Sequence, residues 1–136
     1  MDSAGLQAQA IAIDPPPAVI HIEVMKNFMA IHDTYDDAAA RAYKAHFREM
    51  YPDKMTHGEW AKSTIGEFAT AVQVWQGSRS DFYCTHFTAV SEDHVYKQLE
   101  AWGMPRFFSS MVIETERFTS TLLPEDQEID SSYFED

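Results

Sequence analysis

The hydrophobic residues of this chain are spaced mostly as in helices, and two segments keep this spacing over several turns. Between Thr34 and Pro52 they recur every three or four residues, which predicts a helix with one apolar face. Asp33 or Thr34 is the expected N-cap of this helix, and Pro52 marks its end. The apolar positions are Ala39, Tyr43, Phe47 and Met50.

A second helical segment lies between Thr56 and Gly77. Thr56 and Glu59 have the spacing of a capping box, and Gly77 is a helix stop signal. The apolar face between them predicts one long helix that packs on the core along its whole length. The main positions of this face are Trp60, Thr64, Phe68, Val72 and Trp75.

The segment before these two helices, residues 18–32, fits both a strand and a helix. Ile20, Ile22 and Val24 alternate as they would in a strand. The later residues of the segment fit a helical stripe, so we expect a helix with an extended start. This stripe consists of Val24, Met25, Phe28, Met29 and His32.

The second half of the chain has the composition of strands. Residues 81–90 are dense in aromatic and β-branched side chains, which predicts a strand. Ser91 is then the expected cap of a short helix, which Gly103 and Pro105 end. Residues 106–123 fit either type. We expect a strand there, because the first strand needs a hydrogen-bonding partner.

Together these elements predict an α+β fold that is mainly helical, with three N-terminal helices followed by strand, helix and strand. An all-α bundle is the alternative. A length of 136 residues is typical of one domain, which we place at residues 18–123. Residues 1–17 end in three prolines and are expected to form an extended arm, and residues 124–136 form a separate tail.

The charge of the chain is strongly negative and is concentrated in this tail. The chain has 22 Asp and Glu against 10 Lys and Arg, and residues 124–136 hold six of the acids and no Lys or Arg. Such a balance argues against direct binding to nucleic acid or to an anionic membrane, and it favours a basic protein surface, such as that of a nucleic-acid-binding protein. The residues expected to bind this partner are Glu125, Asp126, Glu128, Ile129, Asp130, Tyr133, Phe134, Glu135 and Asp136.

The sequence also indicates where the protein acts. The single cysteine, Cys84, allows no disulfide within one chain. The first residues lack the basic and apolar regions of a secretory signal, and no apolar run is long enough to cross a membrane. We therefore expect a cytoplasmic protein.

Two sets of residues have the makings of a catalytic or metal site. Cys84 and His86 are two apart on the predicted strand, so both side chains face the same way, and a thiol beside an imidazole can become a nucleophile. A buried strand would instead make Cys84 an inert small side chain. The weak metal candidates are two pairs at helical spacing, His32 with Asp36 and His46 with Glu49.

These candidates are weak, and we expect no cofactor. The order of His46 and Glu49 is the reverse of the Glu-then-His spacing of dimetal helical bundles. The chain also lacks the phosphate-binding glycine loops, the paired-histidine zinc motif and the serine-nucleophile motif.

The expected function is therefore a small acidic protein that binds a basic partner surface without catalysis, as an inhibitor, adaptor or immunity-type protein. A phage or mobile-element inhibitor is a special case of this class. One alternative is a subunit of a homo-oligomer or larger assembly that uses its terminal arms as straps. The other is a small hydrolase or metal-dependent enzyme built on Cys84 and His86, or on His32, Asp36 and His46.

Overall fold

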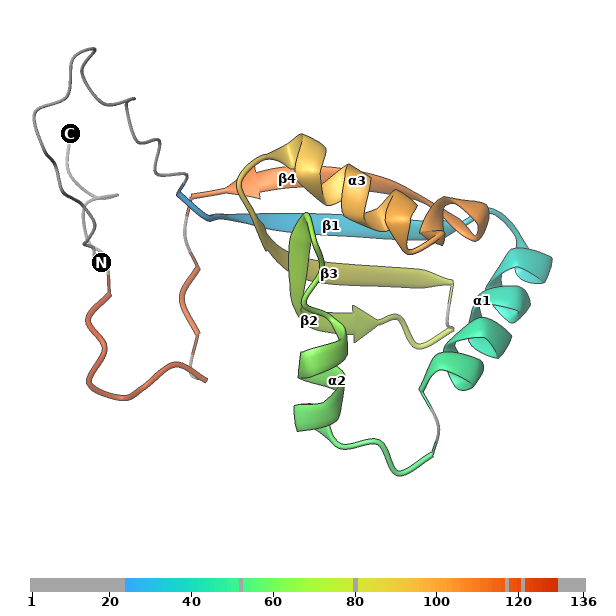
Figure 1. Ribbon diagram of the computed structural model, residues 1–136, viewed down its shortest axis with the longest axis horizontal. Helices are drawn as coiled ribbons and strands as arrows, with labels where there is room; N and C mark the ends of the chain where they lie inside the picture. The colour runs from blue at the N-terminus through green and yellow to red at the C-terminus, as the bar shows by residue number, and fades with distance from the viewer. Residues whose placement is uncertain (1–23, 52, 80, 117, 121, 130–136) are drawn as a thin grey trace, which may run out of the picture.

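The computed structural model describes residues 24–51, 53–79, 81–116, 118–120 and 122–129 (Figure 1). The four strands form one antiparallel sheet in the order β2-β3-β1-β4. In chain order the elements are β1 (Lys26–Thr34), α1 (Asp37–Met50), α2 (His57–Ser63), β2 (Ala69–Gln76), β3 (Phe82–Ala89), α3 (Glu92–Ala101), the 3-10 turn η1 (Met104–Arg106) and β4 (Phe108–Thr115).

The first strand lies in the middle of the sheet, where a helix was expected. β1 is paired with β3 on one side and with β4 on the other. Its burial alternates, because Phe28, Ala30 and His32 are buried whereas Met29 is exposed. This period of two is the signature of a strand with one face on the core. The same residues also fit a helical spacing, which is why the sequence prediction was wrong here.

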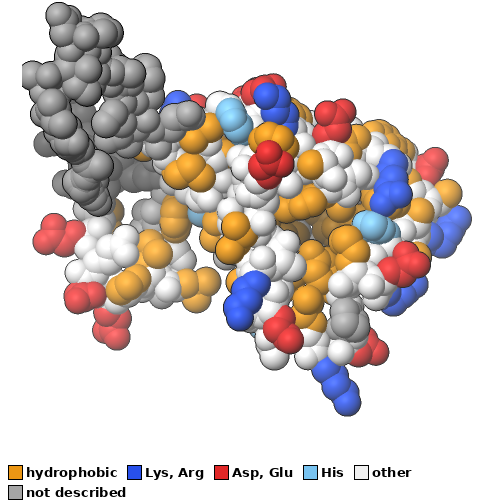
Figure 2. Space-filling model, viewed as in Figure 1, with side chains coloured by type: hydrophobic (Ala, Val, Ile, Leu, Met, Phe, Trp, Pro, Cys, Tyr) orange, Lys and Arg blue, Asp and Glu red, His pale blue; other side chains and the backbone are white. Residues whose placement is uncertain are grey.

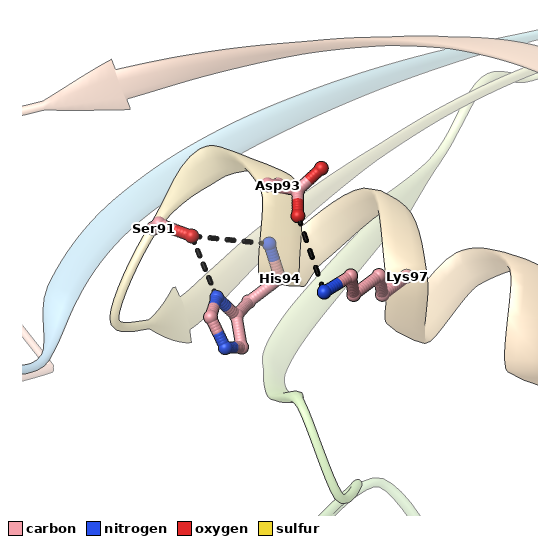
Figure 3. A network of polar contacts seen from close by, with 4 residues as sticks. All are labelled: Ser91, Asp93, His94 and Lys97. Atoms are coloured by element: carbon pink, nitrogen blue, oxygen red, sulfur yellow. Dashed lines mark hydrogen bonds and ion pairs between the residues drawn. The ribbon is translucent and has the colours of Figure 1, made fainter.

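The core lies between the sheet and α3. Val95 and Leu99 of α3 are buried against Phe28, Phe87 and Val112 of the sheet. At the start of α3, the Ser91 hydroxyl oxygen accepts a hydrogen bond of 3.2 Å from the backbone N–H of His94, as the sequence predicts (Figure 3). This cap and the apolar face of α3 fix the helix across the middle of the sheet.

Helices α1 and α2 begin at strong caps but pack loosely. The carboxylate of Asp36 accepts a hydrogen bond from the N–H of Ala39, and Thr56 and Glu59 form the predicted capping box. Neither helix has a buried residue. The main contact of α1 with the core is Tyr43, whose ring lies 5.0 Å from the ring of Tyr83. The caps stabilise each helix itself, and α1 is held on the core mainly through Tyr43.

The long helix expected between Thr56 and Gly77 is two elements instead. α2 ends at Ser63, and β2 begins at Ala69 as an edge strand paired with β3. A β-bulge between Ala71 and Gln73 shifts the register of β2. Trp75, expected in the core, is half exposed at 50%. The residues that were expected to form one apolar helix face belong to a short helix and to the strand that follows it.

The fold class is corrected accordingly. Helix and strand take about equal shares of the described residues, so the protein is α+β but not mainly helical, and an all-α bundle is wrong. The strand predicted at 81–90 is present as β3, and that predicted within 106–123 is present as β4. Among the described residues, no helix combines the length and hydrophobicity that a membrane crossing requires.

The turn between α2 and β2 is closed around Gly66. Its N–H donates to the carbonyl oxygen of Ala69, and the side chain of Gln98 reaches over from α3. The Gln98 Oε1 atom accepts hydrogen bonds from the backbone N–H groups of Phe68, at 2.7 Å, and of Ala69, at 3.1 Å. A Cβ atom at Gly66 would collide with the Gln98 side chain and would lie 2.6 Å from the Ala69 carbonyl oxygen.

We therefore predict that Gly66→Ala lowers the free energy of unfolding by about 1–3 kcal/mol, as overpacking typically does. The matched control is Gly58→Ala in α2, where the nearest atom to a new Cβ is the Thr56 Oγ1 at 3.8 Å. This control should be neutral, or stabilising by up to about 1 kcal/mol through helix propensity. Urea unfolding of both variants measures the difference, and equal stabilities would contradict the role given to Gly66.

Candidate functional site

One face of the sheet is not covered by any described helix. The strand registers place on one face the residues that alternate with the core residues. We call this the open face. It consists of Asn27, Met29, Ile31 and Asp33 of β1, Thr70, Gln73 and Trp75 of β2, Phe82, Cys84, His86 and Thr88 of β3, and Ser109, Met111, Ile113 and Thr115 of β4.

The open face carries an apolar row that crosses all four strands. Met111 is paired with Ile31, Ile31 with Cys84, and Cys84 with Trp75, so these four side chains are cross-strand neighbours. Met111 is 54% exposed and Trp75 is 50% exposed. Ile31 and Cys84 between them are partly buried, so the row exposes apolar surface mainly at its two ends. Exposed apolar surface on a sheet is typical of an interaction site.

The charge on the open face is unusually low for this chain. Asp33 is its one carboxylate, and no Lys or Arg belongs to it, although the whole chain has 32 charged residues excluding histidine. The exposed face of a two-layer antiparallel sheet normally alternates polar and charged side chains with the buried apolar ones. This face therefore combines one charge with uncharged polar side chains and histidine around the apolar row.

Cys84 and His86 lie near the centre of the open face, on the same side of β3 as predicted. The Nε2 atom of His86 is hydrogen-bonded to the Oδ1 atom of Asn27 at 2.8 Å, and the Phe118 ring packs edge-on against the imidazole at 4.9 Å between centroids. Burial raises the pKa of the Cys84 thiol and lowers the pKa of His86. In the described contacts, the imidazole is therefore hydrogen-bonded to Asn27 and not to the thiol. The raised pKa keeps the thiol protonated, whereas an activated nucleophile needs a lowered pKa.

His32 lies on the other face of the sheet, where it is 2% exposed. Its Nδ1 atom is 2.7 Å from the Ser110 hydroxyl oxygen, and its Nε2 atom is 3.0 Å from the Thr85 hydroxyl oxygen. The Phe108 ring covers it at 4.7 Å between centroids. Two rotatable hydroxyls satisfy both ring nitrogens of a neutral imidazole. Burial lowers the pKa of His32 to about 4, so the ring is neutral at physiological pH.

The four metal candidates of the sequence do not come together. Asp36 caps α1, and His46 lies against Phe107 and the Arg106 guanidinium, 3.3 Å from its Nη2 atom. Glu49 is exposed on α1, and His32 is buried between two hydroxyls. Within the described ranges, no group of three His, Cys, Asp or Glu side chains is placed to hold a metal ion.

The acidic tail is described as far as Ile129. Glu125 and Asp126 are exposed in a turn closed by the hydrogen bond from the Gln127 N–H to the Pro124 carbonyl oxygen, and Glu128 is exposed just after it. Ile129 is 64% exposed. This segment borders a groove next to Asn27, at the start of β1. The other predicted partner-binding residues, Asp130, Tyr133, Phe134, Glu135 and Asp136, lie outside the described residues.

The residues that sequence reasoning missed are the apolar members of the open face on β1, β2 and β4. Met111, Ile31 and Trp75 become neighbours only through the strand order, which no local pattern contains. A period-two reading of residues 27–33 would have separated Met29 and Ile31 from the core positions.

Because His32 is neutral in the fold and has an ordinary pKa near 6.5 when unfolded, its burial makes stability depend on pH. The unfolded chain binds the extra proton below about pH 6.5, so this stability is full above that pH. It is lost progressively as the pH falls toward 4, the folded pKa. The difference of about 2.5 pKa units corresponds to about 3 kcal/mol.

The measurement is the free energy of unfolding in urea between pH 7 and pH 4. His32→Gln should remove this component of the pH dependence, whereas the matched variant His46→Gln, in a partly exposed residue of α1, should keep it. Parallel pH curves for the wild type and His32→Gln would show that His32 does not cause the loss.

Comparison with known proteins gives little further information. No protein-family model matches the chain, and no curated protein matches it. A solved structure of PA3566 from Pseudomonas aeruginosa resembles it at 7% sequence identity and a TM-score of 0.42, over 73% of this chain and 100% of that chain. A likeness this distant supports no conclusion about function.

Proposed function

We propose that this protein acts by protein–protein contact without catalysis, and that its open face binds the open face of a second copy. The observation that carries the proposal is the apolar row of Met111, Ile31, Cys84 and Trp75 on a face with a single carboxylate. Contact between such a surface and water is unfavourable, because the burial of each exposed apolar side chain lowers the free energy. A covering partner supplies that burial.

The charge distribution favours a second copy over a basic protein at this face. A basic partner would meet only Asp33 there, so its cations would lose hydration without gaining ion pairs. Two copies, each with a net charge of -12, repel one another, and they approach at least cost through their least charged surfaces. A face that meets itself about a two-fold axis also needs no other partner.

The size of the open face is consistent with a weak or moderate dimer. Four strands of about eight residues span roughly 20 by 25 Å, or about 500 Å² in the plane of the sheet. The relief of the side chains increases this area toward the ~800 Å² per partner that stable interfaces bury. The dimer is therefore expected to depend on protein concentration.

The acidic tail supports a second binding role, toward a basic protein surface. Ile129 is exposed among Glu125, Asp126 and Glu128, so an apolar anchor and several charges are presented together. Such a segment suits an inhibitor or adaptor that docks on a basic, partly apolar surface. The acidic residues of this segment are not members of the open face, although the segment adjoins that face at Asn27.

We predict that the wild type has about twice the chain mass of 15.6 kDa in sedimentation experiments at high concentration and high salt. Met111→Glu should shift it to the monomer, because it places a carboxylate in the middle of an apolar contact. The matched control is Leu122→Glu, which adds the same charge at an exposed position outside the open face and should leave the dimer intact. Cooperative unfolding of both variants verifies that they fold. A wild type that stays monomeric at all concentrations would overturn the face-to-face contact.

Cys84 offers a second, chemical measurement of the same contact. Its thiol lies within the apolar row, so the wild-type dimer should react slowly with a thiol reagent, while folded Met111→Glu should react several-fold faster. The raised pKa of the thiol slows the reaction in both proteins, and the added carboxylate of the variant can only slow it further, so a faster variant reports exposure of the thiol. Dilution of the wild type should raise its rate toward that of the variant. Equal rates at every concentration would mean that nothing covers the open face.

A further inference from the structure

Helix α1 is a locally basic element in a strongly acidic chain. Its three cations and two acids give it a net charge of +1, whereas the rest of the chain has 20 acids and 7 Lys or Arg, a net charge of -13. Arg41, Lys44 and Arg48 are spaced by three and four residues and are all exposed, so they form one stripe along the outer side of the helix. We call this the α1 stripe.

The α1 stripe has no internal partner in the parts of the chain that the structure describes. The ion pairs there are Lys26 with Glu114 and Lys97 with Asp93. The three cations of α1 take part in neither. Figure 2 shows Lys and Arg side chains at the end of the molecule where Figure 1 places α1, and acids without Lys or Arg on the described segment that follows β4.

Apolar surface accompanies the cations. Phe47 lies next to Lys44 and Arg48 on the helix and is 40% exposed, and its ring packs on that of Tyr51 at 4.6 Å between centroids. No residue of α1 is buried. Among the described residues, the helix thus presents three cations without an ion-pair partner beside the exposed Phe47 and the partly buried Tyr51. Its Tyr43 side packs on the core.

The acidic tail has the complementary chemistry. Residues 124–136 contain six carboxylates and the apolar side chains of Ile129, Tyr133 and Phe134. Carboxylates can pair with the α1 stripe while apolar side chains meet Phe47 and Tyr51. The matching of both charge and hydrophobicity makes the tail a better occupant than a purely acidic ligand.

The tail of the same copy cannot lie along α1 in this arrangement. Ile129 and Glu128 border the groove at Asn27, where β1 begins, whereas α1 follows the opposite end of β1 at Thr34. The eight strand residues from Asn27 to Thr34 span about 23 Å, and α1 begins three residues after Thr34. Residues 130–136 reach about 24 Å from Ile129 when fully extended, so none of these residues would remain to follow the helix.

We propose that the α1 stripe, together with Phe47 and Tyr51, binds the acidic tail of a second copy of this chain. The proposal rests on the docking role of the tail given above and names its partner. Charge complementarity and the length of the tail carry it. The contact is electrostatic, so it weakens as the salt concentration rises, unlike the apolar contact of the open face.

The test measures binding of a labelled synthetic peptide, residues 122–136, to the full-length chain by fluorescence anisotropy at low salt. Arg41→Glu, Lys44→Glu and Arg48→Glu together should weaken binding by about tenfold or more, because three attractive pairs become repulsive. The control of equal charge is Lys26→Glu, Arg79→Glu and Lys97→Glu, which leaves α1 intact and should bind nearly as the wild type does. Equal loss in both variants would reduce the effect to net charge and overturn the proposal.

A charge exchange gives the sharpest result. A peptide with Glu125→Lys, Asp126→Lys and Glu128→Lys should bind the chain whose α1 stripe is reversed better than it binds the wild type. Rescue of this kind requires the two segments to be close, whereas unfolding of the variant cannot produce it. Failure of both peptides to bind their matching chains would overturn the α1 contact.

The two proposals fail separately in these experiments. A wild type that is dimeric in high salt but does not bind the peptide overturns the α1 contact alone. A chain that binds the peptide at low salt but is monomeric in high salt overturns the face-to-face contact alone and supports the α1 contact.

Discussion

The central strand β1 must satisfy its backbone hydrogen bonds on both sides, and the remaining structure is arranged around this requirement. Antiparallel pairing with β3 and β4 supplies the partners. Phe28 and Ala30, both fully buried, then fix which face of the sheet the core occupies. Since α3 covers that face and α1 reaches it through Tyr43, the chain has no described helix left for the opposite face. The open face therefore results from the placement of the described helices that pack on the sheet on one of its two faces.

Local signals predicted the elements whose structure depends on local interactions. The caps at Thr56 and Ser91 and the apolar face of α1 act within a few residues, so they could be recognised in the sequence. β1 and β2 were assigned wrongly because their residues fit a helical spacing too, and pairing with distant strands decided between the two. Gly66 lies in the break between α2 and β2, and the turn there depends on Gln98, which is 32 positions further along the chain.

The candidate site was predictable to the same limited extent. That Cys84 and His86 share a face follows from their separation by two residues, and the structure confirms it. Their chemistry depends on partners far away in sequence, namely Asn27 and Phe118, which the pattern could not supply. The same holds for His32, whose neutral state is set by Ser110 and Thr85 from two different strands. Side chains with reactive atoms are recognised in a sequence more easily than the contacts that make them inert.

The distribution of charge connects these observations with binding. A chain of net charge -12 resists self-association through general repulsion, so contacts between copies require surfaces where the repulsion is absent or reversed. The open face satisfies the first condition, because Asp33 is its one carboxylate, and α1 satisfies the second, because its cations outnumber its acids. Acids elsewhere then restrict approach to these two surfaces. The negative charge therefore mainly selects the surfaces through which two copies can bind, and it has less effect on whether they bind at all.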